Sequence, residues 1–163
     1  MYRDPFLRAD GTRLRPWVST EEADEVMIER WNKVVRPCDK VYHLGDVVIP
    51  RSGLQVLDRL NGEKVLVAGN HDARYDKDLP RYFRAVRAHW KLDDLALSHV
   101  PIHPDSIGKF RCNVHGHLHY QEVLLPDGHI DPRYFNVSVE RIDYTPIELS
   151  CLKLIINAHQ NGL

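Results

Sequence analysis

A short polar segment, Gly69-Asn70-His71-Asp72, follows an apolar run at residues 64–68 that is typical of a buried strand. Glycine allows a sharp backbone turn at the end of a strand, and the three residues after it carry an amide, an imidazole and a carboxylate. These groups offer a neutral oxygen ligand, a proton carrier that works near neutral pH, and an acid that can orient it. Alone, the segment is equally compatible with a turn that closes a hairpin.

Three further segments place similar side chains after short apolar stretches. Gly45-Asp46 follows residues 40–44, His99 follows residues 95–98, and Gly116-His117-Leu118-His119 follows residues 112–115. Because the carboxyl ends of strands in an α/β sheet open onto a common edge, we expect these side chains to lie close together. The pattern therefore predicts a cluster of ligands at one edge of a sheet.

The order of the four motifs resembles that of the calcineurin-like metallophosphoesterase superfamily, in its small single-domain bacterial or phage form. The superfamily pattern is Asp-x-His, Gly-Asp, Gly-Asn-His-Asp/Glu, His and Gly-His-x-His, and the likeness covers roughly residues 17–150. The chain departs from this pattern because no Asp-x-His precedes Gly45. The tripeptide Asp127-Gly128-His129 comes after the last motif and is typical of a hairpin turn.

Three explanations of the missing first block are compatible with the sequence. They are a translation start placed too far downstream, a shortened form of the chain, and a natural variant with an altered site. In the superfamily the first block is both a central strand and the source of two metal ligands. The irregular opening segment of the chain, at residues 1–18, favours the first two explanations.

The resemblance implies metal-binding roles for five residues. Asp46 would bridge two metal ions, although an aspartate there is also typical of a turn or a helix N-cap. Asn70, His99 and His117 would complete one site, and this mixture of oxygen and imidazole ligands suits manganese, iron, zinc or nickel. His119 would serve the second ion together with the absent Asp and His.

The resemblance also implies catalytic roles for His71 and Asp72. His71 would hydrogen-bond the phosphate and protonate the leaving alkoxide, and Asp72 could orient its imidazole. A solvent-facing histidine and a turn-stabilising aspartate are the alternative interpretations. Two divalent cations, most simply manganese, would clamp the phosphate about 3.5–4 Å apart and generate a hydroxide for in-line attack. The expected function is metal-dependent hydrolysis of phosphodiesters or small organic phosphates, among which a nucleotide is one candidate substrate.

Two other interpretations remain open. In one, the chain is an enzyme with a single occupied metal site, because one cation can still act as a Lewis acid. In the other, the chain is a truncated or degenerate non-catalytic module that binds metal or phosphate. His71 favours an enzyme, since a pure binding module does not require a proton donor.

Composition limits the classes of protein that fit. The 163 residues, of which 43% are hydrophobic, predict a single domain over residues 1–163. A net charge of −1 gives no general attraction to nucleic acid or to an anionic membrane, so any affinity for phosphate must be local. The ten histidines favour metal binding, and the three cysteines are too few and too widely spaced for a disulfide framework. With neither a signal-peptide core nor a membrane-length apolar segment, we expect a cytoplasmic protein, for which a homodimer remains an option.

The resemblance implies a two-sheet α/β/β/α sandwich of the metallophosphoesterase type without its first strand, which another segment or another chain could replace, and the pattern of predicted elements agrees with this fold. After the irregular leader, the first helix is expected to begin at a Ser19/Glu22 capping box and to end before Pro37. The later predicted elements are a strand to residue 44, a helix at 54–60, a strand before residue 69, a polar loop at 73–81, strands at 82–86, 90–92 and 95–98, a strand at 112–115, a hairpin of 122–125 with 134–139, and a final helix from a Thr145-Pro146-x-Glu148 capping box.

Overall fold

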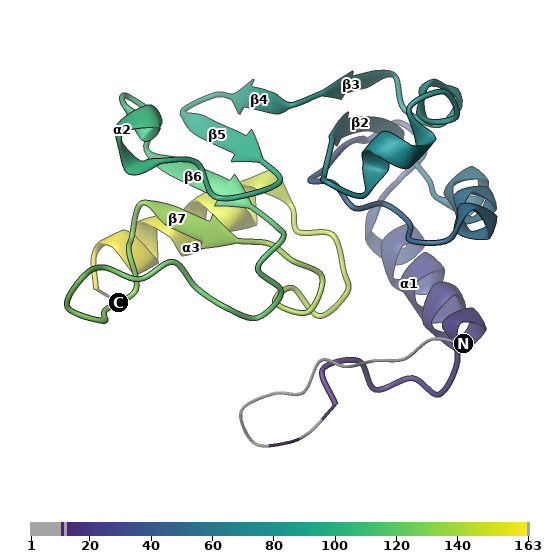
Figure 1. Ribbon diagram of the computed structural model, residues 1–163, viewed down its shortest axis with the longest axis horizontal. Helices are drawn as coiled ribbons and strands as arrows, with labels where there is room; N and C mark the ends of the chain where they lie inside the picture. Colours follow the sequence, from purple (N-terminus) through teal and green to yellow (C-terminus); the bar gives the residue numbers. More distant parts are fainter. Residues whose placement is uncertain (1–10, 12, 163) are drawn as a thin grey trace.

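The computed structural model describes residues 11 and 13–162 as a mixed α/β fold with two β-sheets and helices outside them (Figure 1). The first sheet has three parallel strands in the order β1-β2-β3, which span Lys40–His43, Glu63–Val67 and Ala85–Arg87. The second sheet has four strands in the order β4-β5-β6-β7, which span His89–Leu92, Leu95–Ser98, Cys112–His115 and Tyr134–Asn136. Strands β4 and β5 pair antiparallel, whereas β5, β6 and β7 are parallel. The predicted α/β class with two sheets is confirmed at this level.

The first helix, α1 (Thr20–Val34), has the N-terminal cap that the sequence predicts. The Ser19 hydroxyl accepts the backbone N–H of Glu22 at 3.1 Å, and the Glu22 carboxylate accepts the N–H of Val18 at 2.9 Å. Near its other end, the Trp31 indole N–H donates to the carbonyl of Asn61 at 2.9 Å. The helix is thereby tied to the turn that leads into β2.

Three 3-10 helices, η1 (Arg51–Arg59), η2 (Asp72–Tyr75) and η3 (Leu79–Arg81), contribute to a core on the first sheet. The helix predicted at 54–60 is therefore a 3-10 helix that begins earlier. The polar loop predicted at 73–81 is wrong, because Tyr75 and Leu79 are buried in that core with Leu66 of β2. Two apolar side chains four residues apart thus pack this otherwise polar segment against the sheet.

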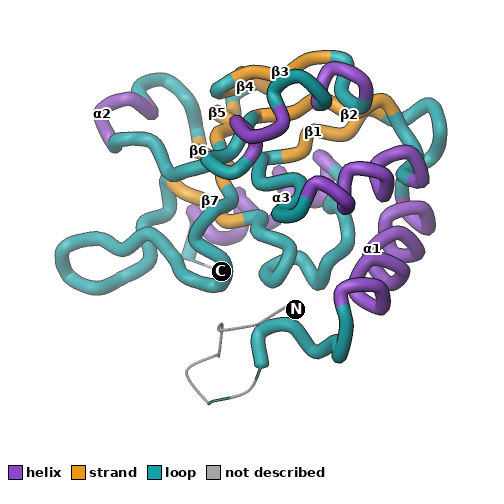
Figure 2. Tube along the Cα trace, turned by 45° about the vertical axis from the view of Figure 1, so that its right-hand side comes forward, coloured by secondary structure: helices purple, strands orange, loops and turns teal. Residues whose placement is uncertain are grey.

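The C-terminal helix α3 (Leu149–Gln160) packs against the second sheet, as Figures 1 and 2 show. Its buried side chains, Leu152 and Ile156, belong to a core that also contains residues of both sheets, including Val67. The capping box predicted at residues 145–148 is wrong, and the helix begins three residues later than Pro146. The Thr145 hydroxyl donates to the carbonyl of Asp143 and so stabilises the preceding turn instead.

The predicted hairpin of residues 122–125 with 134–139 is also wrong. The turn at 126–128 is present, but only an isolated bridge between Leu124 and Ile130 forms around it in the described chain. A second turn, closed by the hydrogen bond from the Tyr134 N–H to the Asp131 carbonyl, redirects the chain. Strand β7 then pairs in parallel with β6, with Phe135 opposite Val114. Strand β3 begins later than predicted, at Ala85.

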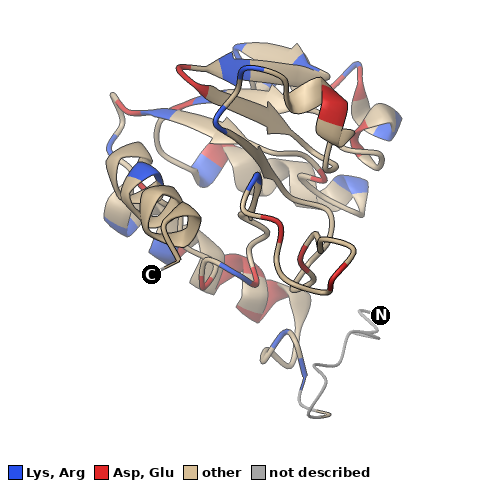
Figure 3. Cartoon of the chain, turned by 90° about the vertical axis from the view of Figure 1, so that its left-hand side faces the viewer, with Lys and Arg blue, Asp and Glu red and all other residues tan. Residues whose placement is uncertain are grey.

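The leader predicted at residues 1–18 lies only partly within the described chain, because residues 1–10 and 12 are outside it. Within the described part, Leu14 is buried and its carbonyl accepts the hydroxyl of Tyr144. No helix within residues 11 and 13–162 is long and apolar enough to cross a bilayer. Basic and acidic residues are interspersed in the view of Figure 3, in keeping with the near-neutral net charge.

Candidate metal centre

Four polar side chains meet just beyond the carboxyl ends of four strands. Asp46 follows β1, Asn70 follows β2, His99 follows β5 directly, and His117 follows β6. We call Asp46, Asn70, His99 and His117 the strand-end cluster. Two of its members come from the first sheet and two from the second.

The ligand atoms of the strand-end cluster converge on the ring of His99. Its Nε2 lies 3.1 Å from Asn70 Oδ1, 3.1 Å from His117 Nδ1 and 3.4 Å from Asp46 Oδ2. Ligands bound about 2.0–2.2 Å from one metal ion lie roughly 3 Å from each other, so these separations fit a coordination shell.

The other nitrogen of His99 determines which tautomer faces the cluster. Its Nδ1 lies 2.7 Å from the carbonyl oxygen of Leu44, which can only accept, so Nδ1 carries the hydrogen. Nε2 of the neutral ring then presents a lone pair to Asn70 Oδ1 and Asp46 Oδ2, which are also acceptors. A divalent cation would satisfy all of these lone pairs, and a metal-ligating histidine commonly donates its second N–H to a carbonyl in this way. The residues present therefore fit a metal.

Two glycines allow the loops after β1 and β2 to approach each other. Gly45 has φ +91°, and a Cβ there would lie 2.5 Å from Gly69 N and 2.6 Å from His99 Nδ1. A Cβ on Gly69 would lie 2.6 Å from Asp46 N. Only glycine fits at both positions. The close approach of the two loops therefore explains why both motifs contain a glycine.

Asp72 holds the same two loops together. Its side chain is fully buried, and its carboxylate accepts the backbone N–H groups of Gly69 at 2.7 Å, Asp46 at 2.8 Å and Val47 at 2.9 Å. The structure therefore gives Asp72 a role in positioning Asp46, which fits the alternative interpretation of a turn-stabilising aspartate; its predicted role of orienting the His71 imidazole stays a prediction.

His71 lies at the edge of the strand-end cluster. Its backbone N–H donates to Asp46 Oδ1 at 2.9 Å, and its Nε2 lies 3.9 Å from Asp46 Oδ2. The side chain is 37% exposed, so a bound molecule could reach the ring. Its predicted role as the acid stays a prediction.

His119 lies two residues beyond His117, but its ring makes a different contact. Nδ1 of His119 lies 3.0 Å from Glu140 Oε1, and Glu140 is almost fully buried. The Asn136 amide donates to the carbonyls of His119 and Gln121 and so fixes the backbone of this loop. Sequence reasoning assigned no role to Asn136 or Glu140, although their polar side chains alternate with apolar residues along residues 135–140.

Three of the predicted ligands have a strained backbone conformation. Six described residues other than glycine have positive φ, and three of them are predicted ligands: Asp46 at 52°, His117 at 67° and His119 at 54°. Each such conformation costs of order 1 kcal/mol or more, and strain of this kind is commonly stored at functional sites.

Burial favours neutral imidazoles around the cluster. Partial burial, followed by the nearby His99 ring, lowers the pKa of His117. Burial also lowers the pKa of His43, which lies behind the cluster on β1. Since a metal binds the neutral form of imidazole, the lowered pKa of His117 favours its ligand form at neutral pH.

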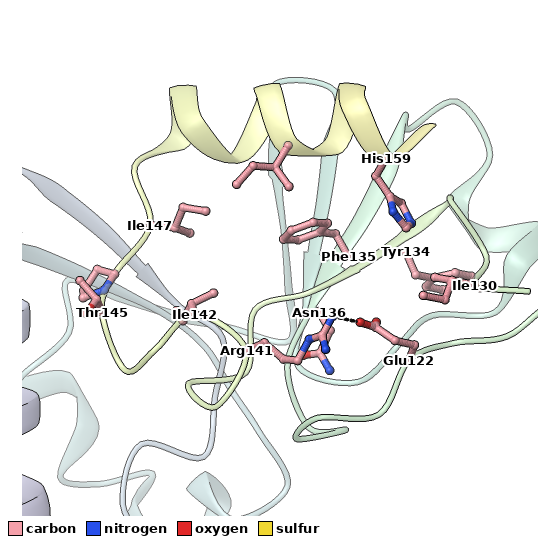
Figure 4. A pocket seen from close by; sticks show the side chains of 12 residues that line it. Glu122, Ile130, Tyr134, Phe135, Asn136, Arg141, Ile142, Thr145, Ile147 and His159 are labelled. Atoms are coloured by element: carbon pink, nitrogen blue, oxygen red, sulfur yellow. Dashed lines mark ion pairs between the residues drawn. The ribbon is translucent and has the colours of Figure 1, made fainter. Parts of the chain in front are cut away.

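A separate groove of about 540 Å³ lies between α3 and β7 (Figure 4). Its lining is largely apolar and includes Phe135, Ile142 and Ile147, with an ion pair between Glu122 and Arg141. No member of the strand-end cluster lines it. We therefore place the candidate site at the strand ends, where polar groups converge.

The fold and this geometry define a two-sheet α/β protein with a candidate metal centre at the strand ends. No family model matches the chain. Uncharacterized protein MJ1445 of Methanocaldococcus jannaschii is 33% identical to it over 148 residues, which are 87% of this chain and 80% of that protein. The chain belongs to the same family as MJ1445. A crystal structure of the protein of unknown function AQ665 from Aquifex aeolicus is similar, with a TM-score of 0.64 and 26% identity over 87% of this chain and 89% of that chain.

Proposed function

We propose that this protein is a metal-dependent phosphoesterase of the calcineurin-like metallophosphoesterase type. It hydrolyses phosphodiesters or small organic phosphates, with nucleotides among the candidate substrates. The observation that carries the proposal is the convergence of the strand-end cluster, whose lone pairs point toward one another around Nε2 of His99. The order of the motifs and the arrangement in two sheets support the same type.

The donor set is suited to manganese, with iron, zinc or nickel as alternatives. The strand-end cluster would hold a divalent cation, which would supply Lewis-acid polarisation of a phosphoryl group and a nucleophile at neutral pH. His119 is the predicted ligand of a second ion. A cytoplasmic location is part of the proposal, because all three cysteines are unpaired.

The protein groups around the cluster have separate tasks in this proposal. His71, which is exposed and hydrogen-bonded through its backbone to Asp46, is the proton donor to the leaving alkoxide. Asp72 holds the loops that carry Asp46 and Asn70. The Leu44 carbonyl keeps His99 in the tautomer whose Nε2 faces the cluster.

The test combines metal analysis with an activity assay on one preparation. Metal per chain is measured by elemental analysis after loading with manganese, and hydrolysis of bis-p-nitrophenyl phosphate is followed in the same sample. We expect bound manganese and turnover, and Asp46→Asn should lower both, with turnover reduced by about 10- to 100-fold or more, because the negative charge of the one carboxylate ligand is lost. The matched control is Asp127→Asn, which changes an exposed turn aspartate.

The outcomes separate the interpretations. Undiminished turnover in Asp46→Asn would contradict the proposal. Manganese bound through Asp46 without turnover of any phosphate ester would instead favour the non-catalytic metal-binding or phosphate-binding module. Loss of turnover in His71→Gln with metal content unchanged would support the role of His71 as the acid.

A further inference from the structure

His115 is a fully buried histidine that does not belong to the strand-end cluster. It is the last residue of β6, which lies between β5 and β7, and its side chain is 0% exposed. Its ring packs edge-on against the ring of Tyr134 on β7, with the two centroids 6.1 Å apart. The neighbouring strands therefore leave the imidazole little freedom to move.

The ring of His115 makes one hydrogen bond within the described chain. Its Nδ1 lies 2.9 Å from the carbonyl oxygen of Gly116, whereas its Nε2 has no partner among the residues that the structure describes. Because a carbonyl oxygen can only accept, Nδ1 is the donor. Burial of a polar ring lowers stability unless its atoms are paired, so packing alone favours an apolar side chain here. What the imidazole adds is the hydrogen bond from Nδ1.

The carbonyl that accepts this hydrogen bond also closes a three-residue turn around His117. The Leu118 N–H donates to the Gly116 carbonyl at 2.7 Å, and His117 between them has φ +67°. A hydrogen bond across three residues with a positive φ at the middle one is typical of the rarer kind of γ-turn, which is strained. Such a conformation persists only where the surrounding structure holds it.

The backbone of Gly116 is held on both sides. Its N–H donates to the carbonyl of His99 at 3.0 Å, and its carbonyl accepts from the ring of His115. This carbonyl belongs to the planar peptide unit that ends at the nitrogen of His117. Its direction therefore sets the direction in which His117 leaves the strand, and Nδ1 of His117 lies 3.1 Å from Nε2 of His99 in the strand-end cluster.

We propose that His115 is a positioning residue for His117. Its Nδ1–H fixes the Gly116 carbonyl, which holds the γ-turn and so keeps the His117 imidazole in the strand-end cluster. The metal that this imidazole would bind rests on the proposed function, whereas the conformation of the turn and its cause do not. A His115 that only fills the core would leave the turn unchanged when its hydrogen bond is removed.

Three substitutions separate the hydrogen bond from the packing. In His115→Asn the amide nitrogen is as many bonds from Cβ as Nδ1 is, so it can donate to the same carbonyl. In His115→Gln the amide nitrogen takes the place of Nε2, one bond further out, and His115→Leu has no donor. The matched control is Tyr134→Phe, which removes a hydrogen bond to the Ile102 carbonyl beside the same ring but leaves the turn unchanged.

The first measurement is the φ of His117 in the full chain without metal, obtained from three-bond NMR couplings. We expect a positive φ in the wild type, in His115→Asn and in Tyr134→Phe. In His115→Gln and His115→Leu, conformers with negative φ should become populated, because the strained turn has lost its support. A negative φ in the wild type, which requires no variant to fold, would overturn the inference. An unchanged positive φ in both His115→Gln and His115→Leu would also overturn it.

The second measurement is calorimetric titration with manganese. We expect His115→Gln and His115→Leu to weaken manganese binding about 10- to 100-fold, as is typical when a residue that orients a ligand is lost. His115→Asn should retain most of the affinity, and Tyr134→Phe should leave it unchanged. If His115 acts through His117, His115→Leu should cause no further loss in a His117→Ala background. Equal losses with and without the His117 side chain would contradict the inference.

The two proposals can fail separately. A φ of His117 that depends on His115, in a protein that neither binds manganese nor hydrolyses any phosphate ester, would support the role of His115 and overturn only the proposed function. Hydrolysis by a protein in which His115→Leu changes neither the φ of His117 nor the manganese affinity would overturn only this inference.

Discussion

At the scale of single residues, the strand-end cluster depends on close backbone contact at Gly45. Its φ of +91° disfavours any other residue, and a Cβ would in addition collide with Gly69. Gly128 separates these effects, because it has nearly the same φ, +88°, with nothing within 4 Å of a Cβ. We expect Gly128→Ala to lower the free energy of unfolding by about 1 kcal/mol and Gly45→Ala to lower it by about 3 kcal/mol or more.

Urea unfolding of the two variants measures this difference. The extra loss in Gly45→Ala should be accompanied by weaker manganese binding, because the displaced loop carries Asp46. Equal losses in the two variants would show that the loops can separate without cost, and that the close contact does not hold Asp46.

At this scale, residues could be assigned to the site from the sequence where the feature that indicates their role lies next to them in the chain. Asp46, Asn70, His99 and His117 could be placed together because each follows an apolar strand. The partners of Asp72 could not be predicted, because they are backbone N–H groups, which every residue but proline has. Glu140 was missed for a different reason: Arg15, which donates to it, is 125 residues away in the sequence.

At the scale of elements, α3 allows a direct test of which of its faces packs against the core. Leu152 is 6% exposed and packs between the sheet and the helix, whereas Leu154 on the same helix is 68% exposed. The same substitution at both positions keeps the change in helix propensity equal. We expect Leu152→Ala to lower the free energy of unfolding by about 2–5 kcal/mol, because it leaves a cavity, and Leu154→Ala to change it by less than about 0.5 kcal/mol. A comparable loss in Leu154→Ala, measured by urea unfolding, would mean that this outer face is also covered.

Elements with local signals were the ones that sequence reasoning placed well. The start of α1 follows from Ser19 and Glu22, which act within one turn of each other. The start of α3 was misplaced because a threonine hydroxyl can cap a helix or stabilise a turn, and Thr145 does the second. Strand β7 was paired with the wrong partner because its neighbour in the sheet is distant in sequence, and a hairpin is the nearest local alternative.

At the scale of the whole molecule, the two-sheet class could be predicted because the order of the motifs resembles that of a superfamily with two sheets, and the pattern of strands and helices agrees with it. The order of strands within each sheet could not, since parallel pairing depends on contacts between distant segments. The same distant contacts explain why a metal centre would matter to the fold. Asp46 and Asn70 extend from the first sheet and His99 and His117 from the second, so one ion would join the two sheets.

This arrangement predicts that manganese stabilises the whole fold. An ion bound only to the folded state at a free concentration 100 times its Kd adds about 2.7 kcal/mol to the free energy of unfolding. For a chain of this size, that corresponds to a rise in Tm of about 5–10 °C. Calorimetric scans with manganese and with a chelator measure the rise, which Asp127→Asn should retain and Asp46→Asn should lose. A rise of the same size in Asp46→Asn would place the stabilising ion elsewhere, because an ion that links the sheets through the strand-end cluster needs the carboxylate as its one charged ligand.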